Sequence, residues 1–353
     1  MDRLRHSFSA LQVDAVLVSH LPNIQYLCGF TGSAGLLLVE SSRSILFTDS
    51  RYTFQAAEEV FGARVHIAKR GLIRALGELL RSRSGRQRIG LAFGNVTVAQ
   101  KQALDGAAGK RVRWAGDGNA VEKLRAVKDA DEIDRMRAAA KLISEVFEDV
   151  VPEIRPGVTE LDLAAKIEYG IKHRGGSGPS FETIVASGPR SAWAHARPTS
   201  KALGKRELVV FDQGAILRGY CSDMTRTVYV GRAPRKVCYL YEAVLQAQQA
   251  AKRAIRPGVK AGDVDKAARQ SLERLGLAKY FTHSTGHGVG IEIHEAPRIG
   301  KGEETVLQEN MVVTVEPGVY LEGLGGIRIE DDVVVTPQGA VDLTTAPRDF
   351  LEL

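Results

Sequence analysis

Five residues whose side chains are common metal ligands lie in order along the second half of the chain: Asp212, Asp223, His287, Glu316 and Glu330. Four carboxylates with one imidazole form a hard, oxygen-rich ligand set, which suits two divalent ions such as Mn²⁺, Co²⁺ or Zn²⁺. Two such ions that share a water molecule lower its pKa and activate it for attack. The residue types therefore indicate a hydrolase with a dinuclear metal site.

The first two of these residues fall in a segment with the pattern of a β-hairpin, Glu207–Val230. Its two apolar strands turn near a Leu-Arg-Gly sequence, and we place the tip at Leu217 and Arg218. With that tip, Asp212 lies directly opposite Asp223, where cross-strand Cβ atoms are roughly 4.5–5.5 Å apart. Two carboxylates so close repel each other strongly unless a cation lies between them. The hairpin therefore indicates that both residues bind a shared ion.

A second pair of strands repeats this arrangement. Glu316 lies in the segment MVVTVEPGVY and Glu330 in GIRIEDDVVVT, and a Gly-rich turn at Glu322–Gly326 joins the two. A lone acidic residue in a strand is more often an edge or turn residue than a ligand. Two hairpins that each carry two carboxylates are harder to explain in that way, so we expect the metal site to be built on β-sheet.

A histidine-rich segment, HSTGHGVGIEIHE, covers His283–Glu295 between the two hairpins. It holds three of the eight histidines of the chain, His283, His287 and His294, whereas histidines that only complete core hydrogen bonds are scattered. A glycine precedes and follows His287, and we expect these glycines to let the backbone approach an ion closely. The segment thus supplies the imidazole ligand.

This segment resembles the signature of the proline-specific metallopeptidases of the creatinase and methionine-aminopeptidase class, whose catalytic domain has the pita-bread fold. The resemblance covers essentially the whole chain. It implies that Asp212 binds one of two ions and that His287 and Glu316 bind the other. It also implies that Asp223 and Glu330 bridge both ions. Two ions are expected in each subunit of a homodimer, with Mn²⁺ the foremost candidate and Co²⁺, Zn²⁺ or Fe²⁺ as alternatives.

The same resemblance assigns catalytic roles. Glu316 would take a proton from the bridging water, which then attacks the scissile carbonyl as hydroxide. Three further histidines of the family match His195 in AWAHARPT, His283 and His294, and His195 or His294 can donate a proton or a hydrogen bond to the tetrahedral intermediate. The family's second-shell arginine matches Arg328, whose guanidinium could hold a ligand carboxylate. An ordinary surface ion pair is the alternative for Arg328.

The expected reaction removes the N-terminal residue that precedes proline, whose tertiary amide lacks the N–H that general peptidases grip. An aminopeptidase P cuts longer peptides of this kind, and a Xaa-Pro dipeptidase, or prolidase, cuts only the dipeptide. The segments YLCGFTGSAG and LFTDSRYTFQA resemble the aminopeptidase P group more, so an aminopeptidase is preferred. HSTGH and the extra N-terminal domain disfavour a methionine aminopeptidase. The complete set of five ligands disfavours a pita-bread protein that only binds partners.

Length and composition predict two domains. Residues 1–120 are expected to form a creatinase-type N-terminal α/β domain, and residues 121–353 an α+β pita-bread catalytic domain. Strands in the first domain are predicted at short apolar runs, and helical spacing begins at Tyr52 and at Leu72. These runs are Ala15–Val18, Gly35–Glu40, Ile45–Thr48 and Ile89–Phe93.

The catalytic domain contains an internal repeat. Ile154–Val158 and Ile255–Val259 both read IRPGV, and each lies between two helical segments of which the first is rich in Ala. Asp129 with Glu132 resembles a capping box at the start of the earliest of these helices. Two copies of one unit, each followed by a metal-bearing strand pair, imply a pseudo-twofold layout with the site between the halves.

The composition agrees with a cytoplasmic enzyme acting on proline-containing peptides. No run of about 18 apolar residues, the length of a membrane span, occurs, and the N-terminus lacks the apolar stretch of a signal peptide. Cys28, Cys221 and Cys238 are widely spaced and read as reduced thiols. The net charge is +6, and Lys69–Arg88 is the most basic segment. No aromatic residue interleaves it, so we expect a solvated surface there and no nucleic-acid partner.

Overall fold

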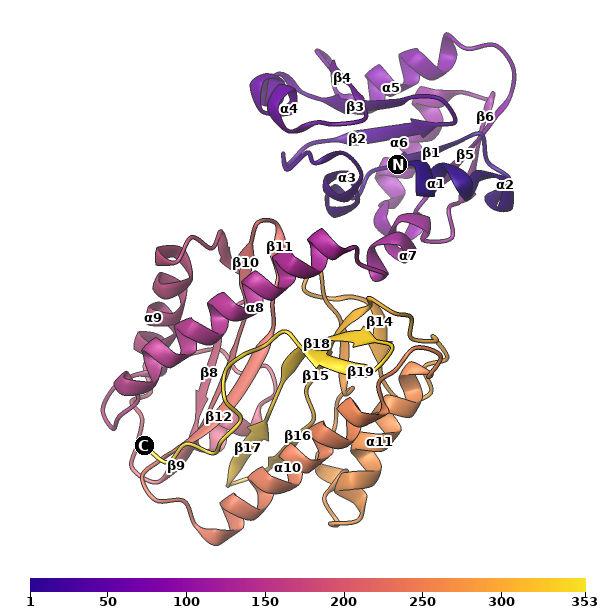
Figure 1. The fold of residues 1–353 in the computed structure, drawn as a ribbon. Coiled ribbons are helices and arrows are strands. Elements are labelled where there is room, and N and C mark those ends of the chain that lie inside the picture. The colour runs from indigo at the N-terminus through magenta and orange to yellow at the C-terminus, as the bar shows by residue number, and fades with distance from the viewer. The chain divides into compact units, whose positions relative to one another are not determined.

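The computed structural model describes residues 1–353, which form two compact units, Met1–Arg125 and Ala126–Leu353 (Figure 1). The sequence predicts a division after residue 120, and the observed division falls slightly later, after Arg125. Helix α7 (Ala120–Ala126) explains the difference, because Ala120 and Val121 belong to the core of the first unit. None of the helices combines the length and the apolar character that a membrane-spanning helix requires.

One six-stranded sheet, with the order β4-β3-β2-β1-β5-β6, forms the centre of the first unit. Its strands are β1 (Ala15–Val18), β2 (Leu36–Glu40), β3 (Ser44–Thr48), β4 (Arg64–Ile67), β5 (Gln87–Leu91) and β6 (Val112–Gly116). β2 pairs with β1 and β3 in antiparallel fashion, and the other pairs are parallel. The helices are α1 (Asp2–His6), α2 (Phe8–Leu11), α3 (Leu21–Cys28), α4 (Thr53–Glu59), α5 (Leu72–Arg81) and α6 (Val98–Ala108), with 3-10 turns η1 (Ser50–Tyr52) and η2 (Phe93–Asn95).

The four strands predicted in this unit are confirmed. Alternate residues of β1 and β2 enter two different hydrophobic cores, one on each face of the sheet, so these strands appear in the sequence as unbroken apolar runs. β4 and β6 were not predicted. They are the two edge strands, and their side chains are partly exposed, so no apolar run marks them.

The second unit carries four long helices on the outer side of its strands (Figure 1). These are α8 (Ala130–Val150), α9 (Glu160–His173), α10 (Arg235–Ala254) and α11 (Ala261–Glu273), with 3-10 turns η3 (Val151–Glu153), η4 (Gly188–Ala192) and η5 (Ala278–Tyr280). The strands before α10 are β7 (Gly178–Pro179), β8 (Ile184–Ser187), β9 (Glu207–Gln213), β10 (Ala215–Leu217), β11 (Tyr220–Cys221) and β12 (Met224–Val230). Those after α11 are β13 (Gly286–Gly288), β14 (Glu295–Ile299), β15 (Val312–Val315), β16 (Gly318–Leu321), β17 (Gly325–Arg328), β18 (Asp331–Thr336) and β19 (Gly339–Asp342).

The strands of the second unit divide between the two halves. The first half has the sheets β11-β10-β7 and β12-β9-β8, and the second half has β14-β13-β15-β18-β19 and β16-β17. The predicted start of α8 is confirmed, because Asp129 and Glu132 form both hydrogen bonds of a capping box. Apolar faces of α8 and α9 pack on β9 and β12 in one core, and those of α10 and α11 pack on β15 to β18 in another.

The internal repeat is confirmed in its hydrogen bonds. Gly157 and Gly258, at matching positions of the two IRPGV turns, have φ of 94° and 89°. The N–H of Gly157 donates to the carbonyl of Leu203, and that of Gly258 donates to the carbonyl of Leu307, both at 2.9 Å. Positive φ favours glycine at both positions. The two halves therefore share one local structure, which supports the pseudo-twofold layout.

The tip of the first hairpin differs from the prediction. Leu217 pairs with Tyr220, so the two tip residues are Arg218 and Gly219 rather than Leu217 and Arg218. Their φ angles are 52° and 80°. A two-residue hairpin loop prefers a type I′ turn, which needs positive φ at both positions, and Leu is a poor residue for that conformation. The prediction was wrong because it ignored this preference.

The new register moves Asp212 opposite Thr225. Asp223 still reaches the same cleft because the ladder is interrupted there, after the end of β11 and before the start of β12. Its N–H donates to the side-chain carboxylate of Asp332 at 2.8 Å and not to a main-chain carbonyl of a paired strand. A Cβ on Gly214 would lie 2.0 Å from Oγ of Ser180 and 2.1 Å from the carbonyl oxygen of Ser222, so this position requires glycine.

The second hairpin is interrupted in the same way. β15 pairs with β18 and β16 pairs with β17 in one continuous register, which puts Glu316 opposite Glu330 between the two ladders. The N–H of Glu316 donates to the carbonyl of Thr285 at 2.8 Å, and that of Glu330 donates to the carbonyl of Thr225 at 3.1 Å. Each of these carboxylate residues is therefore held by a segment outside its own hairpin.

The observed tip yields a stability prediction. Arg218→Asn should raise the free energy of unfolding by about 1 kcal/mol or less, because Asn tolerates positive φ better than Arg. Arg218→Val should lower it, because a β-branched residue is strained in that conformation. Urea unfolding of the two variants beside the unchanged protein measures both effects. Equal stability of Asn and Val at this position would contradict the observed turn.

Candidate metal centre

All nine residues selected from the sequence line one cleft of about 700 Å³ in the second unit. They are the five candidate ligands Asp212, Asp223, His287, Glu316 and Glu330, together with His195, His283, His294 and Arg328. The structure therefore brings both hairpins and the histidine-rich segment to one place.

Strand geometry decides how each candidate ligand enters the cleft. Asp212 lies in β9 and His287 in β13, whereas Asp223, Glu316 and Glu330 stand where a strand is interrupted. In a continuous strand the side chains alternate between faces. The register continues across both interruptions: Glu316 stays opposite Glu330, and Asp223 lies two residues before Thr225, the cross-strand partner of Asp212, so alternation puts each pair of carboxylates on one face of its hairpin.

The glycines beside His287 have a packing role in the sheet. A Cβ on Gly286 would lie 2.0 Å from the carbonyl oxygen of Thr314, and one on Gly288 would lie 2.3 Å from that of Ala296. β13 lies between β14 and β15 in the sheet. The glycines therefore let the neighbouring backbones approach β13, and close approach to an ion is not needed to explain them.

The carboxylates of the cleft fit divalent metal ions. The ligand atoms of Asp223, His287 and Glu330 all lie within 4.8 Å of one another, with Asp212 and Glu316 beside them. The Oδ1 atoms of Asp212 and Asp223 are buried without a hydrogen-bond partner. Burial, followed by the charges of Glu330 and Asp212, raises the pKa of Asp223 well above its usual value. Cations relieve both the missing contacts and the repulsion.

His287 presents a ring nitrogen to these carboxylates. Its Nδ1 donates to the carbonyl of Gly288 at 3.0 Å, so Nε2 carries the lone pair. Nε2 lies 3.6 Å from Oδ2 of Asp223 and 3.7 Å from Oε1 of Glu316. Burial lowers the pKa of His287 to about 4, which keeps the ring neutral near pH 7. A neutral imidazole in this tautomer is the form that binds a metal ion.

Arg328 is buried and holds one of the candidate ligands. Its Nη2 donates to Oδ2 of Asp212 at 2.5 Å, and its Nη1 donates to the hydroxyl of Tyr320 at 2.8 Å. Its Nε donates to Oγ1 of Thr225 at 3.0 Å. The surface ion pair considered from the sequence is therefore excluded, and Arg328 contacts a candidate ligand carboxylate, as the resemblance implies.

Sequence reasoning missed Tyr320, which connects Arg328 to His283. Nδ1 of His283 donates to the carbonyl of Ser284 at 2.8 Å, so its Nε2 accepts a hydrogen bond from the Tyr320 hydroxyl, also at 2.8 Å. Burial, followed by the charge of Arg328, lowers the pKa of His283 to about 4. Tyr320 follows Glu316 by four residues, and an even spacing in a strand was the available signal.

The remaining histidines, His195 and His294, are exposed where they line the cleft. The ring of His294 lies against that of His287, with 4.3 Å between centroids. His195 follows η4 on a loop and has no such ring contact. Exposure leaves the nitrogens of both rings accessible to a molecule bound in the cleft.

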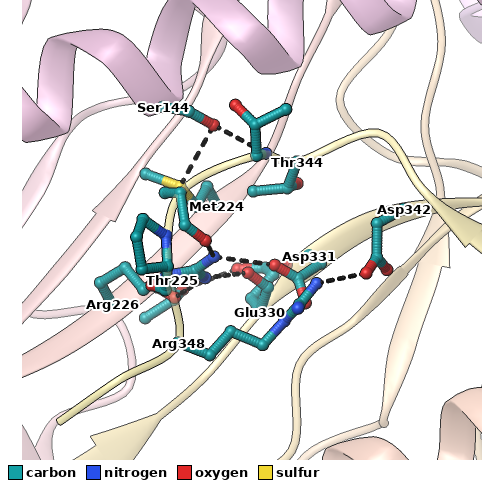
Figure 2. Close-up of polar contacts among 12 residues, drawn as sticks. Ser144, Met224, Thr225, Arg226, Glu330, Asp331, Asp342, Thr344 and Arg348 are labelled. Atoms are coloured by element: carbon teal, nitrogen blue, oxygen red, sulfur yellow. Dashed lines mark hydrogen bonds and ion pairs between the residues drawn. The ribbon is translucent and has the colours of Figure 1, made fainter.

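A second charged cluster, also missed from the sequence, lies behind Glu330. Figure 2 shows the next residue, Asp331, between Arg226 and Arg348. Burial would raise the pKa of Asp331, but the charges of Arg226, Arg348 and Lys252 outweigh it and lower that pKa. Two adjacent acidic residues thus have opposite surroundings, since neighbouring side chains of a strand point to opposite faces.

This cluster also fixes the position of Glu330. Nη1 of Arg226 donates to the carbonyl of Glu330 at 2.6 Å and to that of Thr225 at 2.9 Å. Oγ1 of Thr225 donates to Oε2 of Glu330 at 2.6 Å (Figure 2). Both the main chain and the side chain of Glu330 are therefore tied to the first half of the unit.

Comparison with known proteins agrees with this geometry. The Xaa-Pro dipeptidase of Pyrococcus horikoshii is 34% identical over 343 residues, which cover 96% of this chain and 95% of that protein. The structure of the Xaa-Pro dipeptidase from Bacillus anthracis matches with a TM-score of 0.95 at 35% identity, over 100% of this chain and 98% of the other. The X-Pro aminopeptidase structure from Thermotoga maritima matches with a TM-score of 0.90 at 36% identity, over 99% and 100%.

The buried carboxylates, the neutral imidazole and the two-unit fold define a metal-dependent peptidase. The chain belongs to metallopeptidase family M24, whose model matches residues 134–337, and residues 1–127 match the creatinase/prolidase N-terminal domain. The family and fold inferred from the sequence are therefore confirmed. The preference for an aminopeptidase over a dipeptidase is not confirmed, because relatives with both names match the whole chain.

The electrostatics of the cleft predict that metal reverses the order of stability of Asp223→Asn and the unchanged protein. Without metal, Asp223→Asn should unfold at higher urea concentration than the unchanged protein at pH 7, because it removes a repelled carboxylate. With saturating Mn²⁺ the order should reverse, because the variant lacks one of the candidate ligand carboxylates. Asp331→Asn is the matched control: this buried carboxylate is paired with Arg226, Lys252 and Arg348, and its loss should destabilise the protein by about 3–5 kcal/mol with or without metal. Metal-free Asp223→Asn of reduced stability would contradict the repulsion.

Proposed function

We propose that this protein is a Xaa-Pro dipeptidase, which hydrolyses the bond before proline in a dipeptide with two divalent ions bound by Asp212, Asp223, His287, Glu316 and Glu330. The observation that carries the proposal is the cleft in which these ligands converge with three histidines and Arg328. The names of relatives that match over their full length support the substrate class. Mn²⁺, the homodimer and the cytoplasmic location stay predictions from the sequence.

The two ions, when bound, polarise the scissile carbonyl and lower the pKa of the attacking water. The chain supplies the proton transfers. Burial raises the pKa of Glu316 to about 7, although the charge of Arg328 opposes the shift. A carboxylate with this pKa can take a proton from water and return it to the leaving nitrogen near neutral pH. Exposed His195 and His294 can donate hydrogen bonds to the oxyanion that forms on the substrate.

The proton-transfer role of Glu316 is tested by Glu316→Gln. Turnover should fall by about 10²–10⁴-fold, because the amide cannot accept a proton. Bound metal must be measured at the same time, since the residue is also a proposed ligand. Glu182→Gln is a suitable control, because Glu182 lines the same cleft but pairs with Arg197 at the surface. A Glu316 variant that keeps normal kcat with altered KM would place the base elsewhere.

The choice of a dipeptidase has structural support in Arg298. This residue is the cross-strand partner of His287 in the β13–β14 ladder and lines the cleft. Its side chain is 67% exposed, and the carboxylate paired with it, that of Glu303, is 3.9 Å away. In a Xaa-Pro dipeptide the free carboxylate is attached to the proline Cα, which is bonded directly to the nitrogen of the scissile bond. A guanidinium opposite a metal ligand is suitably placed to bind that carboxylate.

An Xaa-Pro aminopeptidase is the second candidate, because a structure of that name matches the whole chain. It would accept peptides that continue beyond proline, in which no carboxylate occupies this place. Arg298 would then be an ordinary surface cation.

The two candidates differ in their kcat/KM for Ala-Pro and Ala-Pro-Ala. A dipeptidase should prefer Ala-Pro by on the order of 10³-fold, because the longer peptide leaves the cationic donor unpaired. Arg298→Ala should then lower kcat/KM for Ala-Pro by about 10–100-fold and hardly change that for Ala-Pro-Ala. Arg197→Ala, which removes a cleft-lining arginine already paired with Glu182, should have little effect. Equal hydrolysis of both peptides would favour the aminopeptidase.

A further inference from the structure

The position of His195 depends on the loop that carries it. Its ring is exposed and has no hydrogen bond that could orient it. The loop runs from η4 to Thr199 and also brings Ala194, Ala196 and Arg197 to the cleft. A histidine that must meet an oxyanion needs a defined position, so something other than its own contacts must hold the loop.

Glu160, the first residue of α9, binds both ends of this loop. Its carboxylate is fully buried, with an exposed fraction of 0%. Oε1 accepts from the N–H and the hydroxyl of Ser187, each at 2.9 Å. Oε2 accepts from the N–H of Thr199 at 3.0 Å and from its hydroxyl at 2.8 Å. One side chain therefore closes the base of the loop with four hydrogen bonds.

The interior of the loop is braced from the same carboxylate. Nε of Arg190 donates to Glu160 at 3.2 Å, and its Nη2 donates to the carbonyl of Arg197 at 2.5 Å. The guanidinium also lies over the ring of Trp193, 5.0 Å from its centroid. Arg190 thus spans the loop from Glu160 to the residues on either side of His195.

The other half of the unit contains a corresponding arrangement on α11, the helix that the internal repeat relates to α9. Buried Asp265 accepts from the hydroxyl of Thr285 at 2.8 Å and from its N–H at 3.2 Å. Arg269 pairs with Asp265 at 2.7 Å and donates to the carbonyls of Phe281 and His283. A helix carboxylate with an arginine therefore holds a histidine-bearing loop in each half.

We propose that Glu160 is a positioning residue that acts through His195, by closing the loop between Ser187 and Thr199 in the geometry that catalysis needs. The inference rests on the proposed function, because it assumes that His195 contacts the substrate. Glu160 itself does not line the cleft and has no metal-ligand role.

The loop geometry is tested without any substrate. Trp114 and Trp193 are the only tryptophans, so Trp114→Phe leaves Trp193 as the sole reporter, within the loop. In this background Glu160→Gln should lower the residual fluorescence anisotropy of Trp193, because the amide cannot accept four hydrogen bonds and the loop gains freedom. Glu132→Gln is the control: this buried carboxylate caps α8 and contacts Tyr220, and its loss should leave Trp193 unchanged.

The action through His195 is tested by a double-mutant cycle on Ala-Pro hydrolysis. Glu160→Gln alone should lower kcat by on the order of 100-fold with little change in KM or bound Mn²⁺. In a His195→Ala background the same change should cost roughly twofold or less, because the positioned group is already absent. Thr199→Val, which removes one donor and keeps the fold, should show the same pattern with a smaller loss.

Two results would overturn the proposal. One is an unchanged Trp193 anisotropy in Glu160→Gln, or in Thr199→Val if the first variant does not fold. The other is a loss of kcat that is equally large with and without His195. If the unchanged protein does not cleave Ala-Pro, the proposed function fails, whereas the Trp193 anisotropy still decides whether Glu160 holds the loop.

Discussion

Repulsion among buried carboxylates is the constraint on which the catalytic unit depends. Asp212, Asp223, Glu316 and Glu330 line one cleft, in which burial, followed by the charges of neighbouring carboxylates, raises the pKa of Asp223 and that of Glu330 well above their usual values. Divalent ions offset this cost of ionisation when they bind, so much of the affinity for metal is repulsion stored in the folded chain. The fold must therefore be stable enough elsewhere to hold the four groups together before the ions arrive. Two cores, one on each helix pair, supply that stability.

The groups around the site counter this repulsion without neutralising it. Arg328 contacts Asp212 and leaves Oδ1 of Asp223 without a partner, and Thr225 gives Glu330 a single side-chain hydrogen bond. The larger cluster around Arg226 acts only on the main chain of Glu330 and on the opposite face of its strand. Strong cations thus hold the backbone, while Oδ1 of Asp223 stays available to a metal ion. This separation is what a site for small, hard cations requires.

Residue types and their order along the chain were enough to predict the cleft, the family and the two-unit fold. All nine selected residues meet because hairpins and a repeated helix pair bring distant segments together, and both features leave marks in the sequence. The register of the first hairpin was not predictable from the position of the turn alone, because type I′ geometry at Arg218 decided it. Tyr320 and the Arg226 cluster were missed for another reason. Their importance comes from contacts between segments: the even spacing of Tyr320 from Glu316 is a weak signal, and no local pattern distinguishes the Arg226 cluster from ordinary strand residues.

The run Glu330-Asp331-Asp332 has a consequence for how the strand finds its place during folding. The three acidic side chains occupy three different surroundings. Glu330 lines the cleft, Asp331 lies between Arg226 and Arg348, and Asp332 accepts from the N–H of Asp223. A slip of one residue would turn each side chain to the other face. Glu330 would then face Arg226 and Arg348, and Asp331 would enter the cleft on a shorter side chain. The charges therefore favour a single register of β18, although its Val-rich remainder would tolerate other registers.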